Sequence, residues 1–239
     1  MVLEFGLEGK NNMIKSKSLQ TEQILNYKNN IWVNYSMFNL KWMDELKIKP
    51  KIIFDVGCNN GGDSIRFKKQ WPDAEVHAFE ADPTICNIIE EYMEEENINL
   101  LNVGVSNEDG ELEFYPASPV KETKSVGAWG TFVKSRAENN SSLGFSKPVK
   151  VKTISLHTYC QQNNIKKIDL LHIDAEGWDF NVMKGLGSIK TNVIFIEHNP
   201  SIVTYEKINE FQNYMKTNYE FQLYSRGCDS LYTNKNIIK

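Results

Sequence analysis

The stretch that decides the fold is residues 52–63, which read IIFDVGCNNGGD. Apolar residues lead into Asp55, and Gly57, Gly61 and Gly62 follow within a few positions. The next residues, SIRFKKQW, space their apolar side chains as an amphipathic helix does. A buried strand, a tight glycine turn and a helix start form the arrangement with which α/β folds hold a nucleotide-like cofactor. Glycine admits a positive φ and a close ligand, and the helix N-terminus offers free N–H groups.

Length and composition describe one ordinary globular protein. The chain has 239 residues, 41% of them apolar, and a formal net charge of −4. This is enough chain for one well-buried core, and it carries no basic footprint for nucleic acid. The four cysteines form no C-x-x-C pair or metal-binding spacing, which is typical of thiols in a reducing compartment. No apolar run reaches the roughly 18 residues of a membrane span, and the N-terminus has no secretory pattern, so we expect a cytoplasmic protein.

Two regions differ from the core in their pattern. Residues 1–48 predict a flexible segment followed by a helical cap, because apolar and aromatic side chains recur at helical spacing before Pro50. A packing face is favoured over a ligand site for these aromatics. Residues 49–239 form the predicted α/β domain. Within it, residues 116–148 are polar and contain glycines, which indicates either an acceptor lid that carries Trp129 or a disordered insertion.

The rest of the chain alternates between strand and helix patterns. Short apolar runs alternate with amphipathic segments, which predicts right-handed crossovers and a mainly parallel sheet flanked by helices. Helices are expected at residues 64–71, 83–95, 156–164, 178–186 and 205–216. Strands are expected at residues 52–56, 75–79, 98–105, 111–115, 149–154, 168–173, 193–196, 219–224 and 230–232, the last extended weakly by residues 237–238.

The residues after the first two strands indicate the cofactor. Glu80 ends the second strand within FEADP, 25 residues after Asp55, where a carboxylate accepts hydrogen bonds from ribose hydroxyls. The pattern D-x-G-x-x-x-G differs from the G-x-G-x-x-G of dinucleotide sites, and an acidic residue suits an ammonium and a sulfonium better than two phosphates. The sequence therefore favours S-adenosylmethionine over NAD. The adenine is expected at the end of the third strand, beside Asn102, Gly104 and Val105.

Polar residues gather where the fourth and fifth buried strands end. The fourth ends in HIDAEGWD (172–179) and the fifth in IEHN (196–199), at the edge where open parallel sheets bind ligands. His198 is the candidate general base near neutral pH, and the catalytic set is Asp174, Glu197 and His198. A second route uses Mg²⁺ to lower the pKa of the acceptor hydroxyl, with the oxygen ligands Asp174, Glu197 and Asn199. Carboxylates at such an edge also occur without a metal, so both routes stay open.

Four motifs in this order resemble the FkbM-type S-adenosylmethionine-dependent methyltransferases: FDVGCNNGGD, FEADP, LLHIDAEGWDFNVMKG and VIFIEHN. The resemblance spans residues 52–199, and its most specific part is Ile-Asp-x-Glu-Gly at 173–177. It implies a class I methyltransferase (Rossmann-like) sheet of seven strands that ends in an antiparallel hairpin. It also implies O-methylation of a sugar, glycan or other small molecule.

The resemblance also implies roles for single residues. The glycine turn would hold the methionine half of the cofactor, and Glu80 the ribose. The loop after the fourth strand would form the floor between cofactor and acceptor, and Glu197 with His198 would face the acceptor. The expected cofactor-binding set is Asp55, Gly57, Asn59, Asn60, Gly61, Glu80, Ala81, Asp82, Asn102, Gly104, Val105, Asp174, Ala175, Glu176 and Gly177.

Two departures from the family pattern concern the acceptor side. His172 stands where a lysine commonly precedes the Ile-Asp pair, and Asp179 replaces a more usual glutamate. Trp178, beside Asp179, is either a carbohydrate-stacking wall or a core aromatic. We expect acceptor contacts from Trp178, Trp129 and Asn199.

Other classes of protein remain as alternatives. An NAD-dependent oxidoreductase or epimerase would share the sheet, but its G-x-G-x-x-G run and tyrosine–lysine pair are not visible in the sequence. A non-catalytic binding protein on this fold would be expected to lose Asp174, which is present. Base methylation is disfavoured because the chain lacks an Asn/Asp-Pro-Pro-aromatic block. The expected partner is a small-molecule or glycan acceptor, with no nucleic acid, and the sequence leaves a homodimer open.

Overall fold

A computed structural model of the chain describes residues 37–118, 129–139, 144–199, 204–225 and 228–235. Its centre is a seven-stranded sheet in the order β3-β2-β1-β7-β8-β10-β9. Six strands run in the same direction, and β10 alone runs opposite to them, because it pairs antiparallel with both β8 and β9. The strands are β1 (Ile52–Val56), β2 (Glu75–Glu80), β3 (Asn99–Asn102), β7 (Lys167–Ile173), β8 (Lys190–Glu197), β9 (Tyr219–Ser225) and β10 (Asp229–Asn234). The class I methyltransferase sheet with its C-terminal hairpin is therefore confirmed.

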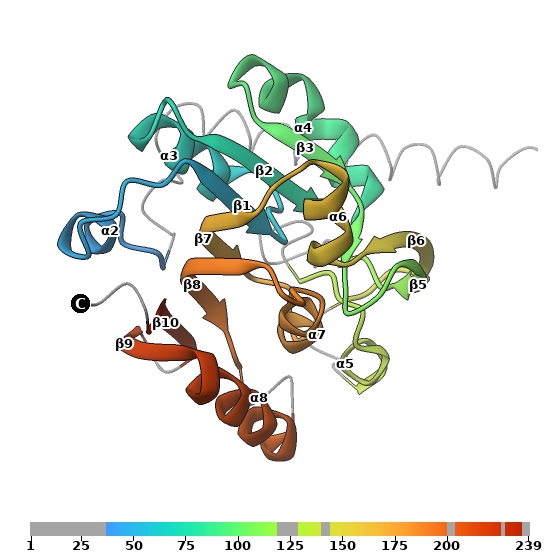
Figure 1. The fold of residues 1–239 in the computed structure, drawn as a ribbon. Coiled ribbons are helices and arrows are strands. Elements are labelled where there is room, and N and C mark those ends of the chain that lie inside the picture. Colours follow the sequence, from blue (N-terminus) through green and yellow to red (C-terminus); the bar gives the residue numbers. More distant parts are fainter. Residues whose placement is uncertain (1–36, 119–128, 140–143, 200–203, 226–227, 236–239) are drawn as a thin grey trace, which may run out of the picture.

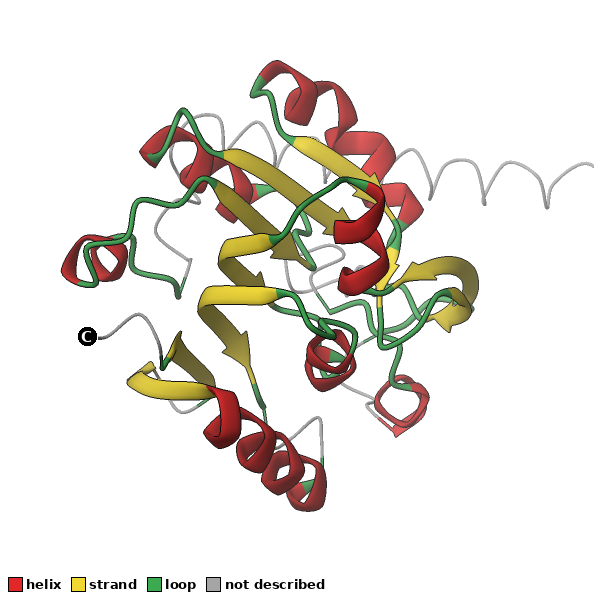
Figure 2. Ribbon diagram, viewed as in Figure 1, coloured by secondary structure: helices red, strands yellow, loops and turns green. Residues whose placement is uncertain are grey.

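Helices cover both faces of this sheet (Figures 1 and 2). One face is covered by α2 (Lys41–Glu45), α3 (Gly62–Gln70) and α4 (Pro83–Glu95). The other is covered by α6 (Leu156–Gln162), α7 (Asp179–Lys184) and α8 (Tyr205–Asn218). Neighbouring strand residues point to opposite faces, so Ile53 and Leu170 pack in one core while Phe54 and Leu171 pack in the other. This is why the strands are apolar throughout.

The predicted third strand, residues 98–105, is wrong as a single element. β3 ends at Asn102, and the chain turns at Val103, whose N–H donates to the carbonyl of Leu101 at 3.1 Å. Gly104 then starts β4 (Gly104–Val105), and an added Cβ at Gly104 would lie 2.4 Å from the Phe132 ring. β4 joins a separate three-stranded sheet, in the order β4-β6-β5, with β5 (Gly110–Phe114) and β6 (Val149–Ile154). The predicted strand at 149–154 is correct in its bounds, but it belongs to this smaller sheet.

The insertion at 116–148 contains more structure than expected. It forms a short helix, α5 (Lys134–Asn139), and two isolated bridges tie Tyr115 to Thr131 and Ala117 to Phe145. Residues 119–128 and 140–143 lie outside the described part of the chain. For its described residues the structure therefore favours an ordered segment over the alternative of a disordered insertion, and the role of an acceptor lid stays a prediction.

The cap region is described from residue 37 onward. Phe38 is buried and makes edge-to-face contacts with Phe67 and Phe195, with ring centroids 5.4 Å apart in both pairs. Trp42 on α2 packs against the same core. The packing face is confirmed for these aromatics, while the rest of the predicted cap lies outside the described residues. The domain boundary at residue 48 stays a prediction.

Candidate active site

A cavity of about 490 Å³ lies at the carboxyl ends of β1, β2 and β7, and we call it the first cavity. Its walls come from the turn after β1, the end of β2, the start of β4, the insertion and the loop after β7. The predicted cofactor residues on its walls are Gly57, Asn59, Glu80, Ala81, Gly104, Val105, Asp174, Ala175 and Glu176. Val56, Phe79, Val103, Phe114, Gly130 and Phe132 complete the lining.

The turn after β1 packs tightly on the loop after β7. Gly57 has a φ of 80°, and a Cβ added there would lie 1.9 Å from the carbonyl oxygen of Asp174. Backbone hydrogen bonds hold the turn, since Gly57 N–H donates to Phe79 O at 2.9 Å and Asp174 N–H donates to Val56 O at 2.9 Å. Only glycine combines this conformation with so close an approach. The turn therefore fixes the end of β1 against the end of β7.

Glu80 presents a buried carboxylate to the first cavity and is 6% exposed. Its Oε2 accepts from Asn59 N–H at 2.8 Å and its Oε1 from Asp82 N–H at 2.7 Å. Burial raises the pKa of Glu80 to about 7, against the lowering effect of these backbone donors. Each oxygen keeps a further lone pair, so the carboxylate can accept hydrogen bonds from two hydroxyls of a ligand.

Asp55 is placed differently and does not line the first cavity. Only 1% exposed, it accepts from Ser64 Oγ at 2.5 Å and pairs with His172 Nδ1 at 2.8 Å. Burial alone lowers the pKa of His172, but the hydrogen bond and charge of Asp55, together with more distant carboxylates, raise it to about 9. His172 is therefore a cation at neutral pH. The geometry gives no support to the predicted direct contact of Asp55 with the cofactor, and it explains His172 as a cationic replacement for lysine.

Four other predicted cofactor residues have structural partners and lie off the cavity wall. Asn60 accepts from Gly62 N–H at 3.0 Å, which orders the start of α3. Asp82 caps α4 by accepting from Thr84 N–H at 2.8 Å. Asn102 Nδ2 donates to Glu80 O at 3.0 Å. The fourth, Gly61, has a φ of 76° and is the residue that precedes α3. Their contact with a cofactor stays a prediction.

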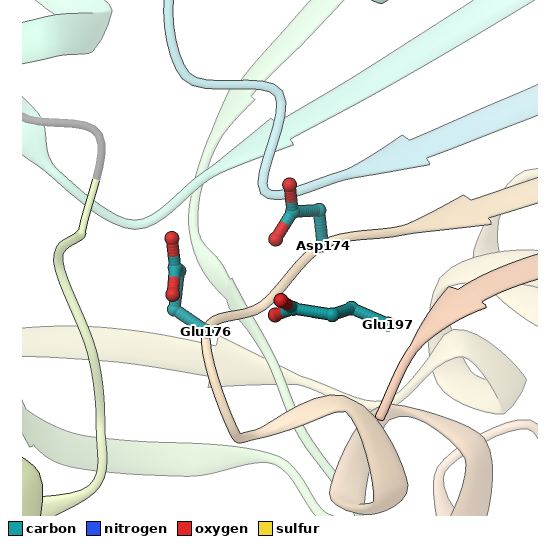
Figure 3. Close-up of side chains that lie close together, drawn as sticks. All are labelled: Asp174, Glu176 and Glu197. Atoms are coloured by element: carbon teal, nitrogen blue, oxygen red, sulfur yellow. The ribbon is translucent and has the colours of Figure 1, made fainter. Parts of the chain in front are cut away.

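Three carboxylates meet at the ends of β7 and β8. Figure 3 shows Glu197 extending from β8 toward the loop that carries Asp174 and Glu176, and ligand oxygens of the three lie within 4.8 Å of one another. Asp174 is accessible from the cavity, yet the protein around it displaces much of its water. Desolvation and then the charge of Glu197 raise the pKa of Asp174 to about 7. Desolvation and the charges of Asp179 and Asp229 raise the pKa of Glu197 to about 7. We call these three residues the open carboxylates.

The carboxylates that lie close enough to share a cation differ in one member from the predicted ligands, and a metal there stays a prediction. Asn199 turns its amide toward the cluster, where Nδ2 donates to Glu197 Oε1 at 3.4 Å. Glu176 supplies the third carboxylate in its place. The sequence prediction missed this because it counted strand ends and did not follow the loop, where Glu176 adopts a φ of 50°. Asp179 folds this loop by accepting from Ala175 N–H at 2.9 Å and Gly177 N–H at 3.0 Å.

The insertion contacts the loop after β7 that carries Glu176. Thr131 Oγ1 and Arg136 Nη1 donate to the carbonyl oxygen of Glu176 at 2.8 and 2.9 Å, and Arg136 also forms an ion pair with the Glu176 carboxylate. Sequence reasoning did not find Arg136, because its partner lies 40 residues away along the chain. Phe132 lies on the cavity wall between Phe114 and Trp178, with ring centroids 5.1 and 5.6 Å away. The insertion thus covers the first cavity.

Trp129 and Trp178, the two tryptophans predicted to contact the acceptor, do not line the first cavity. The Nε1 of Trp178 donates to Ser106 Oγ at 3.2 Å, and its ring packs on Phe132. Of its two alternatives, the core aromatic is favoured. Trp129 lies at the insertion and is partly exposed.

A second cavity of about 570 Å³ lies between α7, α8 and the end of β8. His198 opens onto it rather than onto the first cavity; its ring stacks on Phe211 at 6.3 Å and its Nδ1 lies 3.4 Å from Ser230 Oγ. Burial lowers the pKa of His198, which keeps the imidazole neutral near pH 7. The full lining is Gly177, Asp179, Phe180, Asn181, Lys184, Ile196, Glu197, His198, Asn199, Lys207, Ile208, Glu210 and Phe211.

Comparison with known families agrees with this geometry. The family model of the methyltransferase FkbM domain matches residues 55–223. The chain belongs to the FkbM methyltransferase family. As an FkbM-family domain it carries the glycine turn, Glu80 and the 173–177 block within the matched region. No helix in the described residues is long and apolar enough to span a bilayer.

Individual relatives of this family member are distant. It is 28% identical over 148 residues to the 2-O-methyltransferase NoeI of Sinorhizobium fredii, covering 61% of each chain. It is 27% identical over 143 residues to Methyltransferase 1 of Beauveria bassiana, covering 56% of this chain and 57% of that protein. The chain thus spans about three fifths of the length of these relatives. A crystal structure of methyltransferase FkbM from Methylobacillus flagellatus aligns with a TM-score of 0.48 and 12% identity over 77% of this chain and 43% of that one.

Proposed function

We propose that this protein transfers a methyl group from S-adenosylmethionine to a hydroxyl group of a sugar, glycan or other small molecule. The observation that carries the proposal is the charge of the first cavity. Glu80, Asp174 and Glu176 lie on its wall, and among its described lining residues there is no lysine or arginine. A ligand with two ribose hydroxyls, a sulfonium and an ammonium matches this wall.

The same charge argues against a dinucleotide. A pyrophosphate carries two negative charges and is usually held by backbone N–H groups at a glycine turn. In the first cavity it would face the carboxylates of Glu80 and Asp174, which have no ion pair with a basic side chain among the described residues, and Glu176, which is paired with Arg136. Like charges at such short range in a partly buried site are costly. The NAD-dependent alternative is therefore not favoured.

Bound S-adenosylmethionine would supply an electrophilic methyl group on its sulfonium. In the proposal, Glu80 accepts hydrogen bonds from the ribose, while Asp174 and Glu176 face the cationic half. Methyl transfer is an in-line displacement, so the protein mainly positions the acceptor and excludes water. In the proposal, Glu197 takes the hydroxyl proton as the general base, because it is the one open carboxylate that does not line the first cavity. His198, neutral but on the second cavity, is the other base that the sequence predicts.

Mg²⁺ fits the oxygen ligands of the open carboxylates, since hard cations prefer carboxylate oxygens. Arg136 already neutralises Glu176, so Asp174 and Glu197 are the groups left for a cation. Either a metal or the cationic half of the cofactor satisfies that charge. A Mg²⁺ requirement is accordingly proposed only as an addition to the methyl transfer, and EDTA in the assay tests it.

A cytoplasmic location is also part of the proposal. All four cysteines are free in the structure, and Cys58, Cys86 and Cys160 are buried. Free buried thiols suit a reducing compartment. A homodimer stays a prediction from the sequence.

The experiment is a transfer assay with methyl-labelled S-adenosylmethionine and a panel of glycosides and small alcohols. We expect label in an ether product that resists base hydrolysis, unlike a methyl ester. Parallel samples contain EDTA or Mg²⁺. Label in an ester or amine, or oxidation of the panel with NAD⁺, would contradict O-methylation.

A further inference from the structure

The walls of the second cavity differ from those of the first, which holds most of the predicted cofactor residues. In the second cavity, Phe180, Ile208 and Phe211 form the apolar part of its sides, and Asn181, Lys184, Lys207 and Glu210 form the polar part. Its inner end is polar, because Glu197, His198 and Asn199 follow directly from β8. The cavity has a volume of about 570 Å³ when the space open to solvent is included. Partly apolar sides with a polar floor suit a ring that has C–H faces and hydroxyl groups.

Glu197 connects the two cavities. Glu197 lines the second cavity. A carboxylate oxygen of Glu197 lies within 4.8 Å of carboxylate oxygens of Asp174 and Glu176, which line the first cavity. Gly177 and Asp179, from the loop that forms the floor of the first cavity, also line the second. The two cavities therefore share this loop as a thin partition. A group bound in the second cavity therefore meets the open carboxylates at Glu197.

One atom at this partition needs a hydrogen-bond donor. Glu197 Oε2 is buried and has no hydrogen-bond partner among the described residues, whereas Oε1 accepts from Asn199. A buried acceptor without a partner is destabilising, so such atoms commonly mark the place of a ligand. A hydroxyl donor satisfies Oε2 and is at once the group to be methylated.

An ion pair between two helices forms part of the wall of the second cavity. Lys184 on α7 and Glu210 on α8 form an ion pair with Nζ and Oε1 3.2 Å apart, and Lys184 Nζ also lies 4.3 Å from the centre of the Phe180 ring. The ion pair spans the two helices, and over the whole lining two lysines, Lys184 and Lys207, nearly balance three acidic residues, Asp179, Glu197 and Glu210. A neutral ring suits this lining better than a multiply charged ligand.

We propose that the second cavity is the acceptor site and that it binds a neutral pyranoside ring whose reacting hydroxyl donates to Glu197 Oε2. The proposal rests on the methyltransferase function above and adds the place and chemical class of the acceptor. The ring packs its C–H faces between Phe180 and Phe211, and its other hydroxyls contact His198 and Asn199. In the reaction the acceptor oxygen forms a bond to the methyl carbon, the sulfur–methyl bond breaks with its electron pair left on sulfur, and Glu197 receives the hydroxyl proton.

The test is saturation-transfer NMR with the methyl α-pyranosides of hexoses and 6-deoxyhexoses at millimolar concentration, with S-adenosylhomocysteine present. We expect saturation of the ring protons of at least one pyranoside in the wild-type protein. Phe180→Ala and Ile208→Trp, which open and fill the cavity, should lower the signal at least about fivefold. Tyr205→Ala is the matched control, because Tyr205 begins α8 but is 78% exposed and lies outside the lining.

Calorimetry with S-adenosylhomocysteine on the same samples separates the two proposals. If that ligand binds all four proteins but no pyranoside is saturated, or if both cavity variants keep the wild-type signal, the acceptor site proposed here is wrong and the methyltransferase function stands. If the wild-type protein does not bind S-adenosylhomocysteine, the function itself fails. Retained binding in Phe180→Ala and Ile208→Trp also shows that these variants are folded.

Discussion

Two groups of carboxylates occupy the same edge of the sheet, and their surroundings differ. Asp55, at the end of β1, is sealed beneath α3 and has both oxygens satisfied, by Ser64 and by the His172 cation. The open carboxylates, in the loop after β7 and at the end of β8, face cavities and have one ion-pair partner, Arg136, among the described residues. In sequence all are acidic residues at the ends of buried strands. Burial and pairing, which depend on distant segments, separate them.

The difference shows what each group does for the molecule. A buried ion pair with complete hydrogen bonding holds a frame, because removing one partner leaves an unpaired charge in a medium of low dielectric constant. Carboxylates that lie close together with too few cationic partners repel one another and destabilise the ligand-free protein. A bound cation relieves this repulsion and so stabilises the folded state. The pair of Asp55 and His172, which we call the sealed pair, should therefore matter for folding, and the open carboxylates should matter for binding.

The largest effect is expected where the two groups meet, at Gly57. Gly57→Ala places a Cβ 1.9 Å from the carbonyl oxygen of Asp174 in a backbone with a φ of 80°. We expect a loss of more than about 3 kcal/mol in the free energy of unfolding, measured by urea denaturation, and no detectable cofactor binding. Gly110→Ala is the control, since its added Cβ has 3.8 Å to the nearest atom. Equal stability of the two variants would show that the turn is not packed as described.

His172→Gln comes next and removes the cation of the sealed pair. The loss should be roughly 3 kcal/mol of unfolding free energy, because Asp55 is left buried and unpaired. His172→Lys keeps a cation and should recover most of this loss. Cofactor affinity of the folded protein, measured by calorimetry, should change less than about threefold. If His172→Gln instead lost much of its cofactor affinity while it kept wild-type stability, Asp55 and His172 would belong to the binding site.

Glu80→Gln probes the cavity side with a change of one atom. The carboxylate loses its charge and one acceptor, so affinity for S-adenosylhomocysteine should fall about 10- to 100-fold, which corresponds to roughly 1.5–3 kcal/mol. Glu90→Gln, on the exposed side of α4, is the matched control and should bind as the wild type does. Wild-type affinity in Glu80→Gln would remove Glu80 from the proposed ribose site.

The smallest effect is expected for the stability of Asp174→Asn, and its sign is opposite to that of His172→Gln. Desolvation raises the pKa of Asp174 to about 7 in the folded protein, above its value in the unfolded chain. The charged form is therefore disfavoured by folding, a cost that is complete above pH 7 and absent near pH 4. Because Asp174 is open to solvent, screening reduces the expected gain of Asp174→Asn to roughly 1 kcal/mol at pH 8.

Thermal denaturation at pH 8 and pH 4.5 measures this gain, which should be much smaller at the lower pH. The same variant should bind S-adenosylmethionine more weakly at pH 8. Destabilisation at pH 8 would mean that Asp174 has a stabilising partner in the folded protein and belongs with the sealed group.

Much of the fold followed from local pattern. The apolar runs at β1, β7 and β8 are continuous because these strands are covered on both faces, and α4 matches its predicted bounds because Asp82 caps it and Pro83 starts it. The third strand failed because apolar content does not reveal that Gly104 redirects the chain into a second sheet. The sequence predicted the site as the residues that follow the carboxyl ends of the strands. Arg136, the Asp55–His172 pair and the separation of His198 from the first cavity depend on contacts between segments far apart in sequence, which no local pattern contains.

The most direct test of the central claim is calorimetric titration of the wild-type protein with S-adenosylmethionine, S-adenosylhomocysteine and NAD⁺, each with EDTA and with Mg²⁺. The account predicts saturable one-site binding of both adenosyl ligands and none of NAD⁺, since the first cavity presents carboxylates and no basic side chain among its described lining residues. Binding of NAD⁺ alone, or of none of the three ligands, would contradict it.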